Sequence, residues 1–179
     1  MTDTAAVYGN SLFELAEEEG ITDVIMPEID TVDRLFRDNP DYIRVLREPS
    51  ISKKDRLKLI DEAFSGRINR YLLNFLKILC ENDYAGELPG CAAQFRSRYN
   101  EANDISEARV TSAVKLDETQ REALISRLES MSGRKIILKE KVDAKIVAGL
   151  KVELDGKEFD GTAAGRIKAI RKRVSDINV

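Results

Sequence analysis

The sequence contains no histidine, and this absence excludes several kinds of active site. Serine or cysteine nucleophiles activated by histidine, and zinc hydrolases with two histidine ligands, all require that residue. The chain also lacks a Walker-type glycine loop and a G-x-G-x-x-G segment that opens a helix. Its 32 aspartate and glutamate residues single out no catalytic pair, because solvated surface charge accounts for them. We therefore predict that the protein is not an enzyme, with no catalytic residue, cofactor or metal ion.

Only two cysteines are present, Cys80 and Cys91. Without any histidine to complete a ligand set, two thiols at this spacing are a poor basis for a zinc site. No export signal precedes them, and disulfides are rare in proteins that stay in a reducing compartment. We predict that both are small buried residues on neighbouring helices.

Long hydrophobic runs are absent as well. No apolar segment approaches the roughly 20 residues needed to cross a bilayer. The first residues, MTDTAAVYGNS, lack the basic start and apolar core of a secretory signal. We therefore expect a cytoplasmic protein that meets a membrane only through a partner. The formal net charge of -3 argues against a general nucleic-acid-binding protein, because such proteins carry an excess of lysine and arginine.

Residues 1–104 carry the signals of an all-helical domain. Apolar residues recur at three- and four-residue steps over 4–19, 22–37, 69–82 and 88–103. A short helix is expected after Asp41, and Ser52 opens a capping-box pattern before another. Together these segments predict a six-helix bundle with a core of its own, followed by a linker at 101–104. On the second helix the residues expected to face inward are Val24, Ile25, Ile29, Val32, Leu35 and Phe36.

The segment 69–82, NRYLLNFLKILCEN, is the most apolar helix of the chain. One stripe consists of Leu72, Phe75, Leu76 and Leu79, while Tyr71 and Ile78 form a second. A helix that is apolar on most sides is either central in a bundle or lines a groove that receives a partner. The two interpretations are compatible if one stripe faces the core and the other faces the groove.

Residues 105–179 change in character and predict a small α/β domain. Strand composition and alternation mark 108–116, 136–142 and 150–154. Between the first two, a helix begins at a cap-like Asp117 and ends at Gly133, with Ala123 or Leu124, Leu128 and Met131 on its inner face. Asp155-Gly156 predicts a hairpin turn that brings Phe159 back against the third strand. The fold class is thus α+β, mainly α.

A terminal amphipathic helix is expected after Asp160-Gly161-Thr162. Its apolar stripe recurs at three- and four-residue steps, and its outer face is basic, with Asp176 as the one acid after Thr162. A solvated face, a grip on an acidic partner helix and contact with nucleic-acid phosphates are all compatible with this pattern. The nucleic-acid alternative lacks interleaved aromatic residues and a G-x-x-G loop flanked by basic residues.

These elements in this order resemble the delta subunit of F-type ATP synthases, whose mitochondrial counterpart is the oligomycin-sensitivity-conferring protein. Near the amino terminus, Ala5-Ala-Val-Tyr8 matches the family's A-x-x-Y start, and the segment 75–82 matches its fifth helix. The carboxyl-terminal matches are Lys141-Val-Asp143, Gly149, Leu150-Lys-Val-Glu-Leu154, Asp160-Gly161-Thr162 and Arg166-Ile167.

Three departures from the family pattern stand out. Ala148 replaces the first glycine of a pair, and Gly9 replaces the usual alanine beside Tyr8. Glycine in that place weakens the first helix by up to about 1 kcal/mol. Asp83 and Tyr84 stand where the family often has a basic residue.

The resemblance implies a non-catalytic peripheral-stalk subunit at the cytoplasmic face of the plasma membrane. Residues 1–104 would bind the amino-terminal helices of the alpha subunits, and 105–179 would hold the b-subunit coiled coil. The implied alpha-subunit groove consists of Tyr8, Leu12, Leu15, Tyr71, Phe75 and Ile78. The implied stalk contacts are Arg166, Ile167, Ile170, Arg171 and Val174. The alternative function is a nucleic-acid-binding regulatory adaptor that uses the basic terminal helix.

Overall fold

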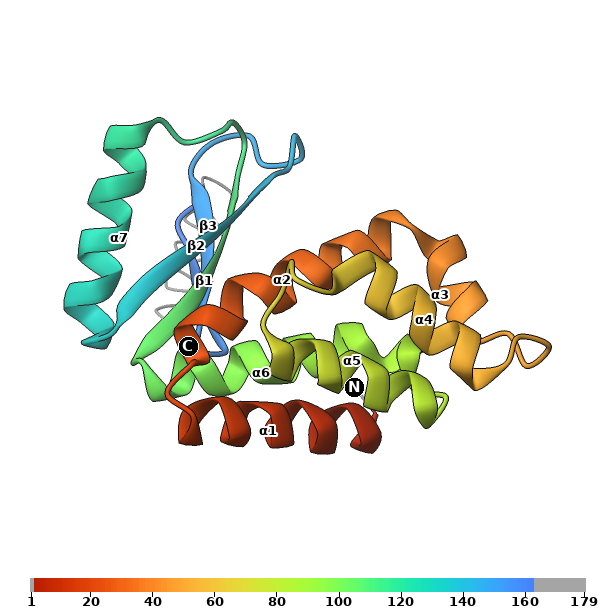
Figure 1. The fold of residues 1–179 in the computed structure, drawn as a ribbon. Coiled ribbons are helices and arrows are strands. Elements are labelled where there is room, and N and C mark those ends of the chain that lie inside the picture. Colours follow the sequence, from red (N-terminus) through yellow and green to blue (C-terminus); the bar gives the residue numbers. More distant parts are fainter. Residues whose placement is uncertain (1, 163–179) are drawn as a thin grey trace, which may run out of the picture. The chain divides into compact units, whose positions relative to one another are not determined.

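A computed structural model describes residues 2–162 of the chain (Figure 1). The chain divides into two compact units, Met1–Asn100 and Glu101–Val179. The architecture is α+β and mainly helical, as predicted. The predicted terminal helix falls on residues outside the described range.

The first unit is built from helices joined by short turns. Its elements are α1 (Asp3–Glu18), α2 (Thr22–Asp38), α3 (Pro40–Leu46), α4 (Lys53–Phe64), α5 (Arg70–Glu81), the 3-10 turn η1 (Ala85–Glu87) and α6 (Leu88–Ala102). The predicted cap at Ser52 is confirmed, because its side chain accepts a hydrogen bond from the Asp55 amide at 3.2 Å. Asn69 caps α5 in the same way, through the Tyr71 amide at 2.9 Å.

The core of this unit confirms that α5 is central. The stripe Leu72, Phe75, Leu76 and Leu79 is buried, and both cysteines are buried as predicted. On α2, however, Val24 and Leu35 are 46% and 45% exposed, so their predicted inward orientation is wrong. The buried stripe of α2 is narrower, with Ile25, Ile29, Val32 and Phe36 at four- and three-residue steps, and the two exposed residues flank it.

Helices α1 and α6 cross at very short distance. A Cβ atom at Gly9 would lie 2.7 Å from the Cys91 carbonyl oxygen and 2.7 Å from the Gln94 Cβ. One at Gly90 would lie 2.7 Å from the Ala5 Cβ. Glycine at position 9 therefore removes the methyl group that would hold the helices apart, and this close crossing offsets its weak helix propensity.

The second unit is a four-stranded sheet with one helix. Its elements are β1 (Ile105–Ser112), α7 (Glu118–Ser132), β2 (Lys135–Val142), β3 (Leu150–Leu154) and β4 (Lys157–Asp160), with strand order β2-β1-β3-β4. Strands β1 and β2 are parallel and connected through α7, whereas β3 lies antiparallel to both β1 and β4. Buried residues of β1, β2 and β3 form a separate core with Leu128 of α7.

Several local predictions for this unit are confirmed. Asp117 and Gln120 form a complete capping box, and Gly133 ends α7 with a left-handed conformation. Asp155 and Gly156 take φ values of 49° and 74°, which is the positive-φ pair that a tight hairpin turn needs. The hairpin therefore forms where the sequence indicated.

Other predictions need correction. Strand β1 ends at Ser112 rather than 116, because the Ser112 hydroxyl donates to the Val114 carbonyl oxygen at 2.7 Å and closes a turn. Met131 is 58% exposed, so α7 packs through Leu128 together with half-buried Leu124 and Ile125. Phe159 is opposite Val152 in register but 40% exposed, since it lies on the edge strand.

Candidate functional site

The residues predicted to form a groove lie on α1 and α5, which contact each other. The end of α5 is tied to the first half of α1 by two aromatic rings. Tyr84 follows α5 closely, with its amide donating to the Leu79 carbonyl oxygen at 2.7 Å. Its ring meets that of Tyr8 edge-on, with centroids 5.7 Å apart.

Exposure separates the predicted residues into two layers. Leu12 and Phe75 are 2% and 7% exposed and belong to the unit's own core, so they support the surface from below. The accessible layer, which we call the apolar band, consists of Tyr8, Leu15, Tyr71, Ile78 and Tyr84. Tyr84 was not among the predicted residues. An aromatic residue just after an apolar helix was the signal that could have indicated it.

Asp83 and Arg56 fix the turn that carries Tyr84. Arg56 is 4% exposed, and its Nη1 donates to the Asp83 carboxylate at 2.8 Å and to the Leu46 carbonyl oxygen at 2.9 Å. The hydrogen bond from Arg56 lowers the pKa of Asp83. Asp83 itself has φ 62°, a conformation that aspartate tolerates better than most residues. The departure from the family pattern at 83–84 thus builds an internal ion pair and one wall of the apolar band.

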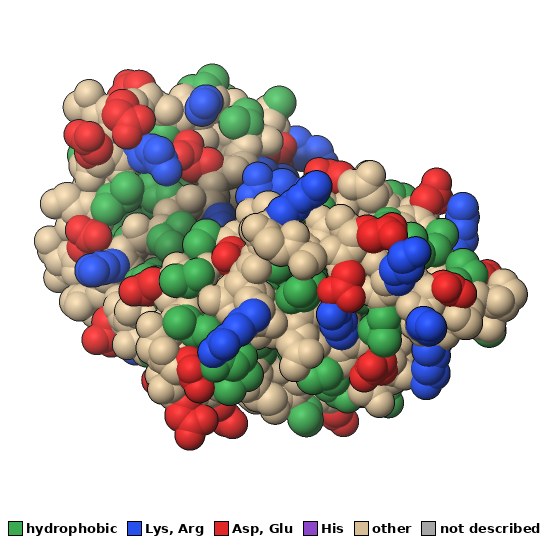
Figure 2. Space-filling model, in the orientation of Figure 1, with side chains coloured by type: hydrophobic (Ala, Val, Ile, Leu, Met, Phe, Trp, Pro, Cys, Tyr) green, Lys and Arg blue, Asp and Glu red, His purple; other side chains and the backbone are tan. Residues whose placement is uncertain are grey.

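At the other end of the band, Tyr71 is held by its neighbour. The Arg70 guanidinium lies 4.7 Å from the centroid of the Tyr71 ring, and its Nη2 donates to the Tyr71 hydroxyl at 3.1 Å. A shallow pocket adjoins this residue and is lined by Arg70, Tyr71, Leu73, Asn74 and Lys77. Of the two basic residues at this end of the band, Lys77 pairs with Asp61 of α4 at 2.6 Å. On the face seen in Figure 2, acidic and basic side chains are interspersed.

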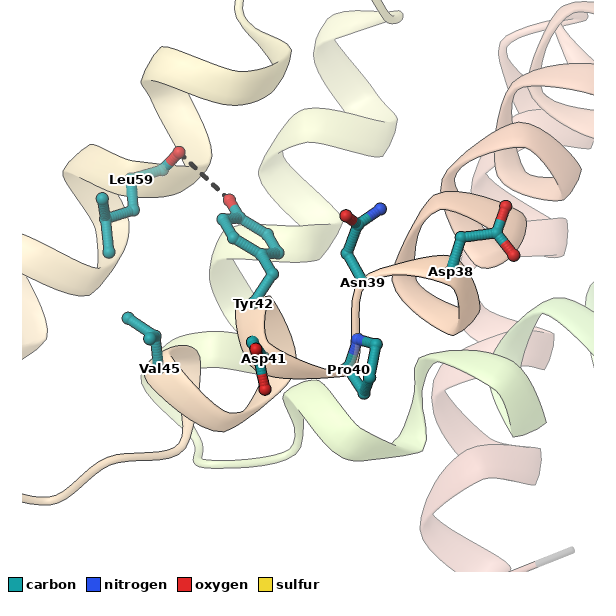
Figure 3. Close-up of a pocket in the computed structure, with 7 residues that line it drawn as sticks. All are labelled: Asp38, Asn39, Pro40, Asp41, Tyr42, Val45 and Leu59. Carbon is teal, nitrogen blue, oxygen red and sulfur yellow. Dashed lines mark hydrogen bonds between the residues drawn. The ribbon is translucent and has the colours of Figure 1, made fainter.

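The structure offers a further pocket, of about 430 Å³, where α2 meets α3 (Figure 3). Three of its polar side chains, those of Asn39, Asp41 and Tyr42, are engaged within the protein. The Tyr42 hydroxyl donates to the Leu59 carbonyl oxygen at 3.1 Å, the Asn39 amide donates to the Leu35 carbonyl oxygen, and Asp41 pairs with Arg44. Burial raises the pKa of Tyr42 to about 12, so its hydroxyl stays protonated. We therefore interpret this pocket as a surface depression left by the packing of α2, α3 and α4, and not as a ligand-binding site.

The two thiols are poorly suited to chemistry. Burial raises the pKa of Cys80 above its usual value and that of Cys91 to about 12, so neither forms a thiolate readily. Across residues 2–162, no group of three or more histidine, cysteine, aspartate or glutamate side chains could hold a metal ion. None of the helices in that range is both long and apolar enough to span a membrane. The predicted stalk contacts Arg166, Ile167, Ile170, Arg171 and Val174 lie outside the described residues.

The fold defines an α+β protein with a helical unit and a mixed four-stranded sheet. The family model for "ATP synthase delta (OSCP) subunit" matches residues 4–174. The chain therefore belongs to the ATP synthase delta (OSCP) family, and this confirms the resemblance seen in the sequence. The protein is thus a component of the ATP synthase complex.

Relatives that align over nearly their whole length support this assignment. The ATP synthase subunit delta of Clostridioides difficile (strain 630) is 28% identical over 171 residues, covering 95% of this chain and 94% of the relative. That of Desulfitobacterium hafniense (strain Y51) is 30% identical, with 94% of each chain covered. A chain of the Toxoplasma gondii mitochondrial ATP synthase hexamer shares the fold, with a TM-score of 0.76 at 14% identity over 97% of this chain and 98% of that one.

Proposed function

We propose that this chain is a non-catalytic stator subunit of a proton-translocating F-type ATP synthase. It links the alpha/beta catalytic head to the b-subunit stalk, so that rotation is coupled to ATP synthesis. Membership of the delta family supports this proposal. Catalysis then belongs to other subunits, and the task of this chain is to bind its partners firmly while the rotor turns.

Each part of the chain has its own partner in this proposal. Residues 1–104, as a six-helix bundle, bind the amino-terminal helices of the alpha subunits, and 105–179 bind the b-subunit coiled coil through the terminal amphipathic helix. The single observation that carries the first half is the apolar band. Its exposed Leu15 and Ile78, with three tyrosines, suit the apolar stripe of an amphipathic helix.

The same proposal fixes where the protein works. It is a peripheral subunit at the cytoplasmic face of the plasma membrane, and it meets the membrane only through partner subunits. The absence of a membrane-spanning helix among residues 2–162 fits this arrangement.

A calorimetric titration with a peptide of the alpha-subunit amino terminus from the same organism tests the proposal. We expect one-to-one binding with a negative heat-capacity change, because apolar surface leaves water on both sides. Replacing Tyr71 and Ile78 with aspartate should weaken binding by about 2 kcal/mol or more, roughly 30-fold, since exposed aromatic and aliphatic anchors dominate such interfaces.

A matched control separates the band from exposed apolar residues in general. Val24→Asp and Leu35→Asp alter α2 residues that are as exposed as Ile78, which is 39% exposed. These variants should bind the peptide like the unchanged protein. Equal affinity of the Tyr71→Asp and Ile78→Asp protein, with its helical circular dichroism intact, would exclude the band as the alpha-subunit site.

A further inference from the structure

The segment between α5 and α6 carries Tyr84, which completes the apolar band. We call residues 82–87 the α5–α6 turn. Two backbone hydrogen bonds close its start: the Asp83 amide donates to the Cys80 carbonyl oxygen at 3.1 Å, and the Tyr84 amide donates to the Leu79 carbonyl oxygen at 2.7 Å. Asp83 has φ 62°. Left-handed backbone is unfavourable for a residue with a Cβ atom, so the turn depends on contacts from outside it.

Two basic side chains of α4 supply such contacts. Arg56 joins the Asp83 carboxylate to the Leu46 carbonyl oxygen, because its Nη1 donates to both. Lys53 Nζ donates to the Glu81 carbonyl oxygen at 2.8 Å. Glu81 is the last residue of α5, and a cation is favourable at the carboxyl end of a helix. The start of the turn is therefore tied to α4, whose residues lie more than 20 positions earlier in the chain.

The end of the turn is held by other parts of the helical unit. The Arg47 side chain packs against Gly86, where a Cβ atom would lie 3.0 Å from the Arg47 Nη1 and 3.3 Å from its Cζ. The Thr2 hydroxyl donates to the Glu87 carboxylate. Tyr84 thus lies between two fixed points, one on each side of it in the chain.

Exposure separates Arg56 from the residues that a partner can contact. The side chains of Arg56 and Asp83 are 5% and 62% exposed, and Tyr84 is 40% exposed. A helix that docks on the apolar band can contact Tyr84, whereas the Arg56 guanidinium lies beneath the surface. An effect of Arg56 on partner binding must therefore pass through the α5–α6 turn that it holds.

We propose that Arg56 is a positioning residue of the apolar band: through Asp83 it keeps Tyr84 in place for a partner helix that Arg56 itself does not touch. This inference rests on the proposed function, in which that helix is the amino terminus of the alpha subunit. A surface side chain that is already ordered loses less conformational freedom when a partner binds. Arg56 therefore strengthens binding by holding Tyr84 against Tyr8 beforehand.

A double-mutant cycle on the full chain tests this inference, with the alpha-subunit amino-terminal peptide as the probe and calorimetry as the measurement. Arg56→Met and Asp83→Ala should each bind the peptide about fivefold more weakly, because each leaves the turn without its charged tie. Tyr84→Ala should bind about tenfold more weakly, since it removes an aromatic anchor of the band. Once Tyr84 is alanine, adding Arg56→Met should change the affinity by less than about twofold, because the residue that Arg56 positions is gone.

Fluorine NMR of the fluorotyrosine-labelled chain measures the position of Tyr84 without any partner. The Tyr84 signal is identified by its loss in Tyr84→Phe. In Arg56→Met this signal should move towards its position in the unfolded protein, because the ring leaves its edge-on contact with Tyr8. The signal of Tyr99 on α6, whose hydroxyl donates to Asp23 at 2.8 Å, should stay unchanged. A general loss of stability would not single out Tyr84 in this way.

The matched control is Tyr42→Phe, which removes a hydrogen bond between α3 and α4 but leaves the turn intact, and it should bind the peptide like the unchanged protein. If Arg56→Met weakened binding equally with and without Tyr84, or left the affinity unaltered, the positioning role would be wrong while the proposed function stood. Asp83→Ala repeats the test from the exposed end of the ion pair, so the outcome does not depend on one buried substitution. Failure of the unchanged chain to bind the peptide would instead overturn the alpha-subunit half of the proposed function.

Discussion

Replacing Gly9 with alanine tests the close crossing of α1 and α6. In an isolated helix this change stabilises by about 0.5–1 kcal/mol, because glycine loses more backbone freedom on folding. Here the added methyl group would meet a backbone carbonyl oxygen and a side-chain carbon, both at 2.7 Å. The carbonyl oxygen belongs to the backbone of α6 and cannot move aside by a rotamer change, so the helices must separate.

The two effects have opposite signs, and the crossing should dominate. Forcing an extra methyl group into a packed contact costs about 1–3 kcal/mol. After subtraction of the propensity gain, Gly9→Ala should destabilise the helical unit by about 1 kcal/mol. For a unit of this size that loss lowers the melting temperature by about 4–8 °C.

Urea unfolding followed by circular dichroism measures this difference. The matched control is the pair Ser11→Gly and Ser11→Ala, at an exposed position of the same helix. In that pair alanine should be the more stable by the propensity term alone. If Gly9→Ala were stabilising by the same amount as the Ser11 pair, α1 and α6 would not be in contact at this position, and the reasoning would fail.

Three further predictions follow from buried groups and tight turns. Arg56→Met removes the guanidinium donor from the buried Leu46 carbonyl oxygen and leaves it with the weak Cys80 thiol donor at 3.8 Å, which should cost about 1–3 kcal/mol in urea unfolding at neutral pH. The pKa of Asp83 is lower in the folded state than in the unfolded state. The stability that the Asp83 carboxylate contributes is therefore present above its unfolded-state pKa, and it is lost as the pH falls through its folded-state pKa. The free energy of unfolding of Arg56→Met should lack this dependence on acid pH, because the hydrogen bond that lowers the pKa is gone. The pKa of Tyr42 is raised to about 12, so the stability that this residue contributes is present below pH 10 and is lost as the pH rises towards 12. Tyr42→Phe should remove this loss of stability at alkaline pH. It should also lower the free energy of unfolding by about 1 kcal/mol at neutral pH, because the hydrogen bond to the Leu59 carbonyl oxygen is lost. Gly149→Ala should destabilise the sheet unit by about 2 kcal/mol or more. Amide exchange should become faster in β3 and stay unchanged in α5. An unchanged exchange rate in β3 as well would contradict the close contact between Gly149 and Gly161.

The local signals in the sequence were sufficient for the elements themselves. Ser52, Asp117 and the Asp155-Gly156 pair act within a few residues of their own position, so their roles could be read without knowledge of the fold. The buried stripe of α5 was equally clear, because its spacing matches one helix face. The family was also evident, since its motifs follow one another along nearly the whole chain.

The tertiary structure decided which apolar residues stay accessible. Val24, Leu35 and Met131 flank a buried stripe, and whether a flank is covered depends on where neighbouring helices lie. In the same way Leu12 and Phe75 lie within the core, while Tyr84 enters the apolar band.

The sequence by itself thus determined the class of fold, the main order of helices and strands among residues 2–162, and the family. Only the tertiary structure explained the two residues that depart from the family pattern most visibly. Gly9 looks like a weak point in a helix until the Cys91 carbonyl oxygen is seen beside it, and Asp83 looks unpaired until Arg56 reaches it from α4. The physical reason is that helix propensity and capping are local properties, whereas close backbone crossings and buried ion pairs join residues that are tens of positions apart in the chain.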